Sequence, residues 1–252
     1  MANNSQVDRF RTLHELGLFV MPNPWDRGSA LTLQEAGFSA LATTSAGFAR
    51  SIGKDDQELT RDELVGHVAD LTSVISVPLN VDSERLFPDD PGGIAETVRL
   101  LAEAGAAGCS IEDYDPRTDR VDELSTAVAA VEAAVEACAE HDLVLTARAE
   151  NHLYGITDLD NTIERLLAYT AAGADVLYAP GPRTAADIGR LVEAVDRPLN
   201  VLAMPDGPSA PELEALGVRR VSIGSTLYNA VARTLRDAAT ELTEHGTSHY
   251  AR

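Results

Sequence analysis

Eight short runs of apolar and β-branched residues recur along the chain, and several are continuously apolar rather than alternating. A continuous apolar run is typical of a strand buried on both faces of a parallel sheet, because neither face meets water. The pattern therefore predicts eight strands of a parallel sheet. They cover residues 18–21, 40–43, 77–82, 108–112, 143–148, 176–179, 199–203 and 220–223.

Amphipathic stretches of helical length lie between these runs. The predicted helices cover residues 60–74, 126–140, 158–172, 187–195 and 226–245. The first opens with Thr60 and Glu63 at capping-box spacing, and the third ends at Gly173, a residue suited to close a helix. Repeated alternation of strand and helix favours a (β/α)8 TIM barrel that covers residues 1–252 as a single domain. An open doubly wound sheet is the alternative, but no GxGxxG motif follows the first strand.

The composition of the chain excludes some classes of binding partner and indicates the cellular compartment. The chain has 252 residues and a formal net charge of −20, which disfavours nucleic acid and anionic membranes because both would be repelled. The two cysteines, Cys109 and Cys138, have no metal-ligand spacing, and we expect both to pack in the core. No run approaches the roughly 20 apolar residues of a membrane span, and no apolar signal core follows the N-terminus. These features predict a cytoplasmic protein.

Charged residues follow several predicted strands. Asp82, Glu84 and Glu112 follow or end two of them, and Arg148 ends another. Active sites of α/β barrels lie at the carboxyl ends of the strands, so these side chains are expected to converge. Clustered carboxylate oxygens suit a hard cation such as Mg²⁺, although a solvated acidic loop is the alternative for Asp82 and Glu84. Arg148 is expected either to pair with this cluster or to bind a substrate carboxylate.

Polar residues after other strands are expected at the same end of the barrel. They include Asn23, Trp25, Thr43, Thr44, Ser45 and Asn200. The turn from Thr43 to Gly47 is small and rich in hydrogen-bond donors, so it suits either an anion-binding nest or simply a tight connection.

An ordered set of motifs resembles the isocitrate lyase/phosphoenolpyruvate mutase superfamily, from about residue 20 to residue 225. Each piece alone has little specificity, but the ordered set is specific. The motifs are Asn23-Pro24-Trp25-Asp26, Thr44-Ser45-Ala46-Gly47, Ser51-Ile52-Gly53 with Asp56, Asp82-x-Glu84, Ile111-Glu112-Asp113, Ala147-Arg148, Ala172-Gly173-Ala174-Asp175, Pro198-x-Asn200-Val201 and Leu216-Gly217-Val218.

The resemblance implies a phosphoenolpyruvate mutase-like barrel that assembles as a homodimer or homotetramer, with the last helix swapped onto a neighbour. It implies Mg²⁺, with Mn²⁺ as an alternative, near Asp82, Glu84 and Glu112. It also implies a small 2-oxo or 2-hydroxy carboxylate substrate, held by residues 43–46, including Ala46, and by Arg148. Asp56 matches a loop aspartate that approaches the substrate. Trp25 and Asn200 fall in the matched motifs and are expected to bind substrate, while Asp56, Glu112 and Arg148 are expected to be catalytic.

The chain departs from the family in its specificity loops. Isocitrate and methylisocitrate lyases carry a catalytic cysteine loop after the Glu-Asp pair, whereas this chain reads Tyr114-Asp115-Pro116-Arg117-Thr118. The sequence predicts a Mg²⁺-dependent lyase that breaks a C–C bond through a pyruvate-enolate-like intermediate, resembling oxaloacetate decarboxylase or methylisocitrate lyase. The alternatives are P–C chemistry on phosphonopyruvate or phosphoenolpyruvate, as a mutase or hydrolase, and a barrel that binds a carboxylate without turnover.

Overall fold

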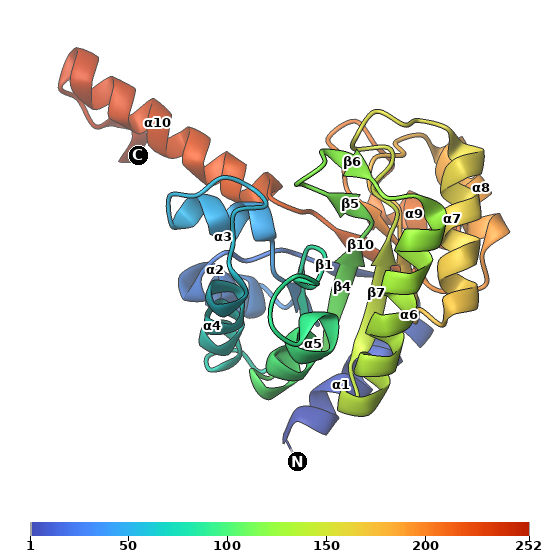
Figure 1. The fold of residues 1–252 in the computed structure, drawn as a ribbon. Coiled ribbons are helices and arrows are strands. Elements are labelled where there is room, and N and C mark those ends of the chain that lie inside the picture. The colour runs from blue at the N-terminus through green and yellow to red at the C-terminus, as the bar shows by residue number, and fades with distance from the viewer. Residues whose placement is uncertain (1, 252) are drawn as a thin grey trace.

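The computed structural model describes residues 2–251 and contains an eight-stranded parallel sheet that curls into a barrel (Figure 1). The strand order is β1-β10-β9-β8-β7-β4-β3-β2. A backbone hydrogen bond of 3.0 Å from Ala42 N to Pro22 O links the segments of the first and second strands at the two ends of this order. The predicted (β/α)8 barrel is therefore confirmed, and the open-sheet alternative is wrong.

All eight barrel strands lie within the runs predicted from the apolar pattern. They are β1 (Phe19–Met21), β2 (Leu41–Ala42), β3 (Leu79–Val81), β4 (Gly108–Glu112), β7 (Val144–Arg148), β8 (Val176–Tyr178), β9 (Leu199–Leu202) and β10 (Arg220–Ser222). Their residues are mostly buried, as expected for strands with helices on one side and a packed barrel interior on the other. Two further strands, β5 (Tyr114–Asp115) and β6 (Arg120–Val121), form a separate antiparallel hairpin directly after β4.

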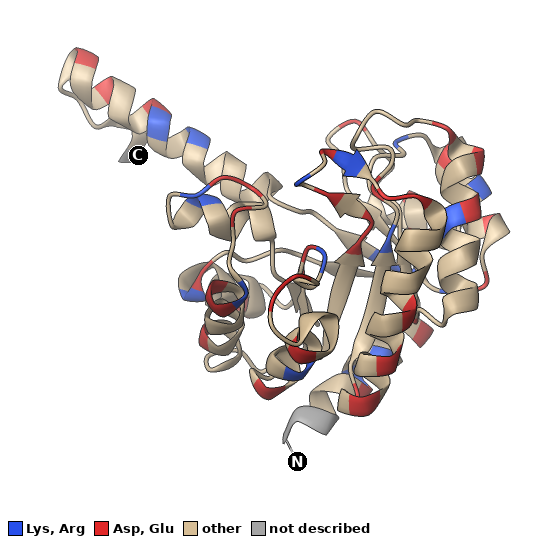
Figure 2. Ribbon diagram, in the orientation of Figure 1, with Lys and Arg blue, Asp and Glu red and all other residues tan. Residues whose placement is uncertain are grey.

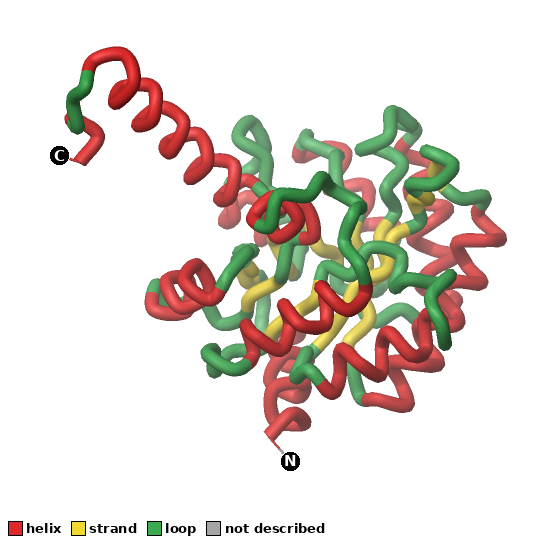
Figure 3. The backbone as a smooth tube through the Cα atoms, turned by 60° about the vertical axis from the view of Figure 1, so that its left-hand side comes forward, coloured by secondary structure: helices red, strands yellow, loops and turns green. Residues whose placement is uncertain are grey.

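Helices surround the sheet (Figure 3). They are α1 (Ala2–Glu15), α2 (Arg27–Glu35), α3 (Ser45–Ser51), α4 (Arg61–Thr72), α5 (Gly93–Glu103), α6 (Leu124–His141), α7 (Leu159–Ala172), α8 (Ala185–Ala194), α9 (Ala210–Ala215), α10 (Thr226–His245) and the 3-10 helix η1 (His249–Ala251). The five predicted helices are α4, α6, α7, α8 and α10, with ends within two residues of the prediction. Thr60 caps α4 in a capping box with Glu63, and Gly173 ends α7 with a φ of 104°.

The first helix closes the amino-terminal end of the barrel. Val7 and Phe10 of α1 are buried against the beginnings of the strands, where they join a cluster with Met21, Ala107 and Val144. A second, larger cluster fills the space between the sheet and the outer helices. Cys109 and Cys138 lie in that cluster as free thiols, as predicted. With the base sealed by α1, the carboxyl ends of the strands form the open end of the barrel.

The last long helix leaves the barrel. In Figure 1, α10 projects away from the other helices, and none of its residues is buried. Acidic residues are spread along the helices and the loops of the ribbon (Figure 2), consistent with the net charge. None of the helices in residues 2–251 combines the length and apolarity needed to cross a lipid bilayer.

Candidate active site

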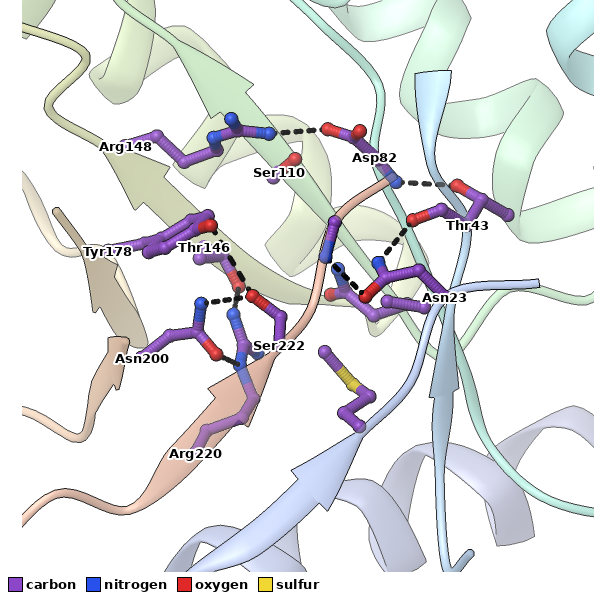
Figure 4. A pocket seen from close by; sticks show the side chains of 14 residues that line it. Asn23, Thr43, Asp82, Ser110, Thr146, Arg148, Tyr178, Asn200, Arg220 and Ser222 are labelled. Carbon is purple, nitrogen blue, oxygen red and sulfur yellow. Dashed lines mark hydrogen bonds and ion pairs between the residues drawn. The ribbon is translucent and has the colours of Figure 1, made fainter. Parts of the chain in front are cut away.

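The carboxyl ends of the strands surround a cavity of about 400 Å³, counted with its opening to solvent (Figure 4). Every strand of the barrel, or the residue just beyond it, supplies at least one side chain to the wall. The lining residues are Met21, Asn23, Ala42, Thr43, Asn80, Asp82, Ser110, Thr146, Arg148, Tyr178, Asn200, Arg220, Ser222 and Gly224. Convergent polar groups at this end of a barrel are typical of an active site.

Arg148 lies at the centre of a carboxylate cluster at the cavity wall. Its Nη1 contacts Asp82 and lies 2.8 Å from Glu112 Oε1, while its Nε lies 2.8 Å from Glu150 Oε1. The guanidinium carbon also lies 4.9 Å from the centre of the Tyr178 ring. Burial opposes the charged form, but the charges of Glu112, Glu150 and Asp82 outweigh it and raise the pKa of Arg148. Of the two predicted roles for Arg148, pairing with the acidic cluster is the one present in this structure.

Asp82 is held by the turn that follows β2. Its backbone N–H donates to the Thr43 hydroxyl at 2.8 Å. Its carboxylate accepts from the backbone N–H and the hydroxyl of Ser45, at 2.9 and 3.0 Å. Thr44 caps α3 by accepting from Gly47 N, which fixes the direction of the turn. Thr43 and Ser45 thus orient Asp82. Thr44 does not contact Asp82 but caps α3, and Ala46 lies partly exposed in the first turn of that helix.

Glu84 does not lie on an extended segment after Asp82. The backbone turns after β3, with φ of 49° at Glu84, 59° at Leu86 and 49° at Phe87, so the alternation of an extended strand does not apply there. Glu84 is 7% exposed, and its Oε1 has no hydrogen-bond partner among the described residues. Burial and then the charges of Asp82 and Asp56 raise the pKa of Glu84 to about 8.

Glu112 completes the group of three carboxylates that the sequence assigned to a metal. It is 6% exposed, and its Oε2 accepts from Gln57 Nε2 at 3.2 Å. Burial raises the pKa of Glu112 well above its usual value, against the opposing charge of Arg148. Asp56 lies on the neighbouring loop; its side chain is exposed, but partial desolvation and the Asp82 charge raise the pKa of Asp56. Gln57, next to it, was not singled out from the sequence.

The donor set suits a hard cation, although the side chains are not gathered around one point. Among residues 2–251, no three acidic, histidine or cysteine side chains form a metal-ligand cluster. The Arg148 guanidinium instead contacts both Asp82 and Glu112. The cluster nevertheless contains more carboxylates than cations. Beside it lie two buried oxygens, Glu84 Oε1 and Gln57 Oε1, that have no hydrogen-bond partner in the described part of the chain. Such oxygens favour a cation or its bound water.

Asp113 has a different role from its neighbour Glu112. Its carboxylate accepts from the Arg165 guanidinium at 2.9 Å, from the Tyr169 hydroxyl at 2.5 Å and from the backbone N–H of Glu150 at 2.8 Å. Asp113 therefore ties α7 and the loop after β7 to the end of β4, and it does not join the carboxylate cluster. Through this contact it positions Glu150, which the sequence analysis missed. Burial raises the pKa of Glu150 to about 7, against the charge of Arg148.

The remaining predicted residues divide between the cavity and its surroundings. Asn200 lines the cavity and donates to the Ser222 hydroxyl at 2.9 Å. Trp25 lies outside the cavity wall and packs edge-on against Tyr228 of α10, with ring centres 5.5 Å apart. Several lining residues were not predicted, namely Asn80, Ser110, Thr146, Tyr178, Arg220 and Ser222. A signal existed for some: polar residues alternate within β7 and β10, and alternate residues of a strand face the same side.

The loop that departs from the lyase cysteine motif forms the β5–β6 hairpin beside the cluster. Tyr114 of this hairpin stacks on Tyr154, with ring centres 3.5 Å apart and an angle of 7° between the planes. The Tyr114 hydroxyl donates to Asp119 at 2.7 Å. The two rings connect the loop after β4 to the loop after β7, so aromatic packing occupies the position at which the sequence lacks the catalytic cysteine loop.

Comparison with known proteins defines the family. The family model of phosphoenolpyruvate phosphomutase matches residues 10–243. A crystal structure of a lyase/mutase candidate from Burkholderia cenocepacia has a TM-score of 0.95 and 46% identity, covering 100% of this chain and 93% of that one. Oxaloacetate decarboxylase of Paraburkholderia xenovorans is 30% identical over 90% of this chain and 78% of its own length. For 2-methylisocitrate lyase of Escherichia coli the identity is 29%, over 86% of this chain and 77% of its own length.

The chain belongs to the phosphoenolpyruvate mutase family, within the isocitrate lyase/phosphoenolpyruvate mutase superfamily. The resemblance inferred from the sequence motifs is thus confirmed. Its relatives include lyases and mutases, and the chain is an enzyme of this superfamily.

Proposed function

We propose that the protein is a lyase that uses Mg²⁺ or Mn²⁺ to break a C–C bond beside the carbonyl or hydroxyl carbon of a small 2-oxo or 2-hydroxy acid. Decarboxylation of an oxaloacetate-like acid is the most concrete version, because it needs no cysteine acid. The observation that carries the proposal is the cluster around Arg148, in which a largely buried guanidinium at the cavity wall contacts Asp82, which also lines the cavity, and the buried carboxylates of Glu112 and Glu150. Similarity to an oxaloacetate decarboxylase supports it.

The residues of the chain divide the work as follows. Asp82, Glu84 and Glu112 would hold the divalent cation, which when bound would supply positive charge to a substrate oxygen that becomes negative during bond cleavage. Arg148 would hold the substrate carboxylate and face the same developing charge, where exclusion of water strengthens the attraction. Thr43 and Ser45 orient Asp82. Helix α1 closes the amino-terminal end of the barrel, so the cavity would open to solvent only at the carboxyl ends of the strands.

Cleavage or rearrangement of a P–C bond is the second candidate. It is favoured by the family model, which describes a phosphomutase, and by 32% identity to a phosphonomutase candidate from Burkholderia cenocepacia over 95% of this chain. The same metal and guanidinium charges would stabilise the enolate of pyruvate in that reaction. A barrel that binds a carboxylate without turnover is the third outcome of the test below.

A panel of 2-oxo acids, 2-hydroxy acids and phosphonopyruvate, each with and without Mg²⁺, tests the proposal. The lyase predicts Mg²⁺-dependent release of pyruvate or another 2-oxo acid from a carbon acid. Phosphate release from phosphonopyruvate, or its conversion to phosphoenolpyruvate, would support the second candidate. Calorimetric binding of oxalate without turnover of any compound would contradict both enzymatic assignments.

We further propose that the protein is cytoplasmic and works as a homodimer or homotetramer assembled through α10. Val231, Leu235 and Leu242 on this helix are 55%, 70% and 48% exposed in the single chain, and their spacing places them on one face. An exposed apolar face of this kind suits burial against a second copy.

A further inference from the structure

A second guanidinium lies deeper in the barrel than Arg148, and it has no anionic partner. Arg220 on β10 is 1% exposed. Its Nε donates to Asn200 Oδ1 at 3.0 Å and its Nη2 donates to the Thr146 hydroxyl at 3.0 Å. By contrast, Arg148 and Arg165, which are also largely buried, contact carboxylates. Among the ion pairs of residues 2–251, none involves Arg220.

The third contact of Arg220 is also uncharged. Its Nη1 lies 3.4 Å from Nε2 of His14 on α1. The other ring nitrogen of His14 lies 2.8 Å from the carbonyl oxygen of Phe10, which can only accept, so that nitrogen carries the proton. Nε2 is then an acceptor on a neutral ring. Burial and the charge of Arg220 lower the pKa of His14 to about 3, consistent with this form.

A buried cation of this kind is costly unless something compensates it. Removing a guanidinium from water without an opposite charge costs free energy that neutral hydrogen bonds repay only in part. Arg220 also lines the cavity, at the end away from the opening (Figure 4). Asn80 lines the same cavity and is 4% exposed, and its Oδ1, a hydrogen-bond acceptor, has no partner among the described residues. The deep end of the cavity therefore contains polar groups that the protein alone leaves incompletely satisfied.

The strand positions place the two arginines in different layers of the barrel. Arg220 bonds to Thr146, which lies two residues before Arg148 on β7 and faces the same side. Two residues of a strand span about 7 Å, so Arg220 lies roughly one side-chain layer below Arg148. A molecule of about three to five carbon atoms with two negative groups can lie between these layers.

We propose that Arg220 is an anion-binding residue at the floor of the cavity, which holds the second negative group of a short dianionic substrate while the first lies near Arg148. The inference rests on the proposed function in that it takes this cavity as the substrate site. It assigns a residue that selects dianionic over monoanionic acids.

Calorimetric titration in Mg²⁺ tests the assignment with two ligands, pyruvate as the monoanion and 3,3-difluorooxaloacetate as the dianion. Arg220→Met removes the charge at similar volume, and Arg220→Lys retains it. Arg190→Met, which removes an exposed arginine paired with Asp160, serves as the matched control. We expect Arg220→Met to weaken the dianion at least about tenfold and pyruvate by less than about threefold, with Arg220→Lys between wild type and Arg220→Met.

Unchanged dianion affinity in Arg220→Met would overturn the assignment. Equal weakening of both ligands would also overturn it, because a merely structural arginine acts on both. Failure of the wild-type protein to bind either acid would contradict the proposed function itself, and the assignment with it. If Arg220→Met does not fold, a crystal of the wild-type protein with Mg²⁺ and difluorooxaloacetate decides. A carboxylate oxygen within hydrogen-bond distance of Arg220 supports the assignment, and a ligand that does not reach Arg220 overturns it.

Discussion

Arg148 is the residue on which the electrostatics of the site depend. One guanidinium contacts the carboxylates of Asp82, Glu112 and Glu150. Removing one partner of a buried ion pair leaves the others desolvated without compensation, which costs about 3–5 kcal/mol. Truncation to alanine would therefore combine a loss of stability with any loss of catalysis. A lysine retains the charge but lacks the planar fork that contacts several oxygens at once.

Arg148→Lys should lower kcat/KM by about 100-fold or more on whichever acid the panel identifies. Lysine lacks the planar forked donors of the guanidinium, so hydrogen bonds to the transition state are lost. The melting temperature should change by only a few degrees, since the positive charge remains among the carboxylates. Steady-state kinetics and thermal denaturation of the same preparation measure the two effects. Arg190→Lys, an exposed exchange of the same kind, is the control. A wild-type rate in Arg148→Lys would rule out the assigned role.

At this scale the sequence predicted part of the site. Asp82, Glu112 and Arg148 were accessible to prediction because each follows or ends an apolar run, and the carboxyl ends of barrel strands converge. Glu150 and Arg220 were not, because their importance comes from burial and from partners distant in sequence, such as Asp113 and His14. The turn at Glu84 could not be predicted, because a positive φ is expected at glycine or asparagine and not at glutamate.

Helices α3 and α4 support the turn that holds Asp82. His67 of α4 stacks on Phe48 of α3, with ring centres 3.8 Å apart and an angle of 8° between the planes. His67 is 6% exposed, and its Nε2 has no hydrogen-bond partner within residues 2–251. Burial lowers the pKa of His67 to about 4, so the ring is neutral in the folded protein at neutral pH.

This burial predicts a loss of stability in acid. Between about pH 6.5 and pH 4 the unfolded chain protonates His67 and the folded chain does not, so the unfolded state binds more protons and stability falls as the pH falls. The contribution of one such histidine is about 2–3 kcal/mol. Urea denaturation at pH 7 and pH 5 should show a smaller difference for His67→Phe, which keeps the stacking, than for wild type. The same difference in both proteins would contradict the prediction.

The sequence analysis gave ranges for the eight barrel strands and five helices, but not for the β5–β6 hairpin or for helices α1, α2, α3, α5 and α9. The barrel strands and five helices follow from apolar runs and from caps such as Thr60 and Gly173. The strands of the β5–β6 hairpin have two residues each and α3 has seven, which is too few for a periodic pattern to stand out. The hairpin depends instead on contacts such as the stacking of Tyr114 on Tyr154. The hairpin follows Glu112 directly, and α3 begins at Ser45, which bonds Asp82, so the surroundings of the carboxylate cluster were less predictable than the barrel.

The whole molecule consists of a closed barrel that builds the site and a long helix, α10, that projects from it with no buried residue and contacts the barrel loops near its first turn. The alternation of strands and helices in the sequence predicts the barrel. It does not predict that α10 projects from it, because an amphipathic helix has the same sequence pattern whether its apolar face packs on its own chain or on another one. Trp25 contacts Tyr228 near the start of α10, so the cavity loops and the projecting helix are linked.

Leu235→Glu should disrupt assembly, since it places a charge in the centre of the exposed apolar face of α10. Light scattering after gel filtration should give a dimer or tetramer for wild type and a smaller species for the variant. Thr240→Glu adds the same charge on the opposite face of α10 and should leave the assembly intact. A monomeric wild-type protein, or equal behaviour of the two variants, would contradict assembly through this face.

We expect the carboxylates beside Arg148 to bind a divalent cation, and titration with Mn²⁺ followed by electron paramagnetic resonance measures this binding. One Mn²⁺ per chain should bind, and Mg²⁺ should displace it. In both Asp82→Asn and Glu84→Gln the affinity should fall at least about tenfold. Glu164→Gln, which removes the negative charge of an exposed residue on α7, should bind Mn²⁺ as tightly as wild type. Absence of binding in wild type, or equal binding in the cluster variants and Glu164→Gln, would contradict the claim.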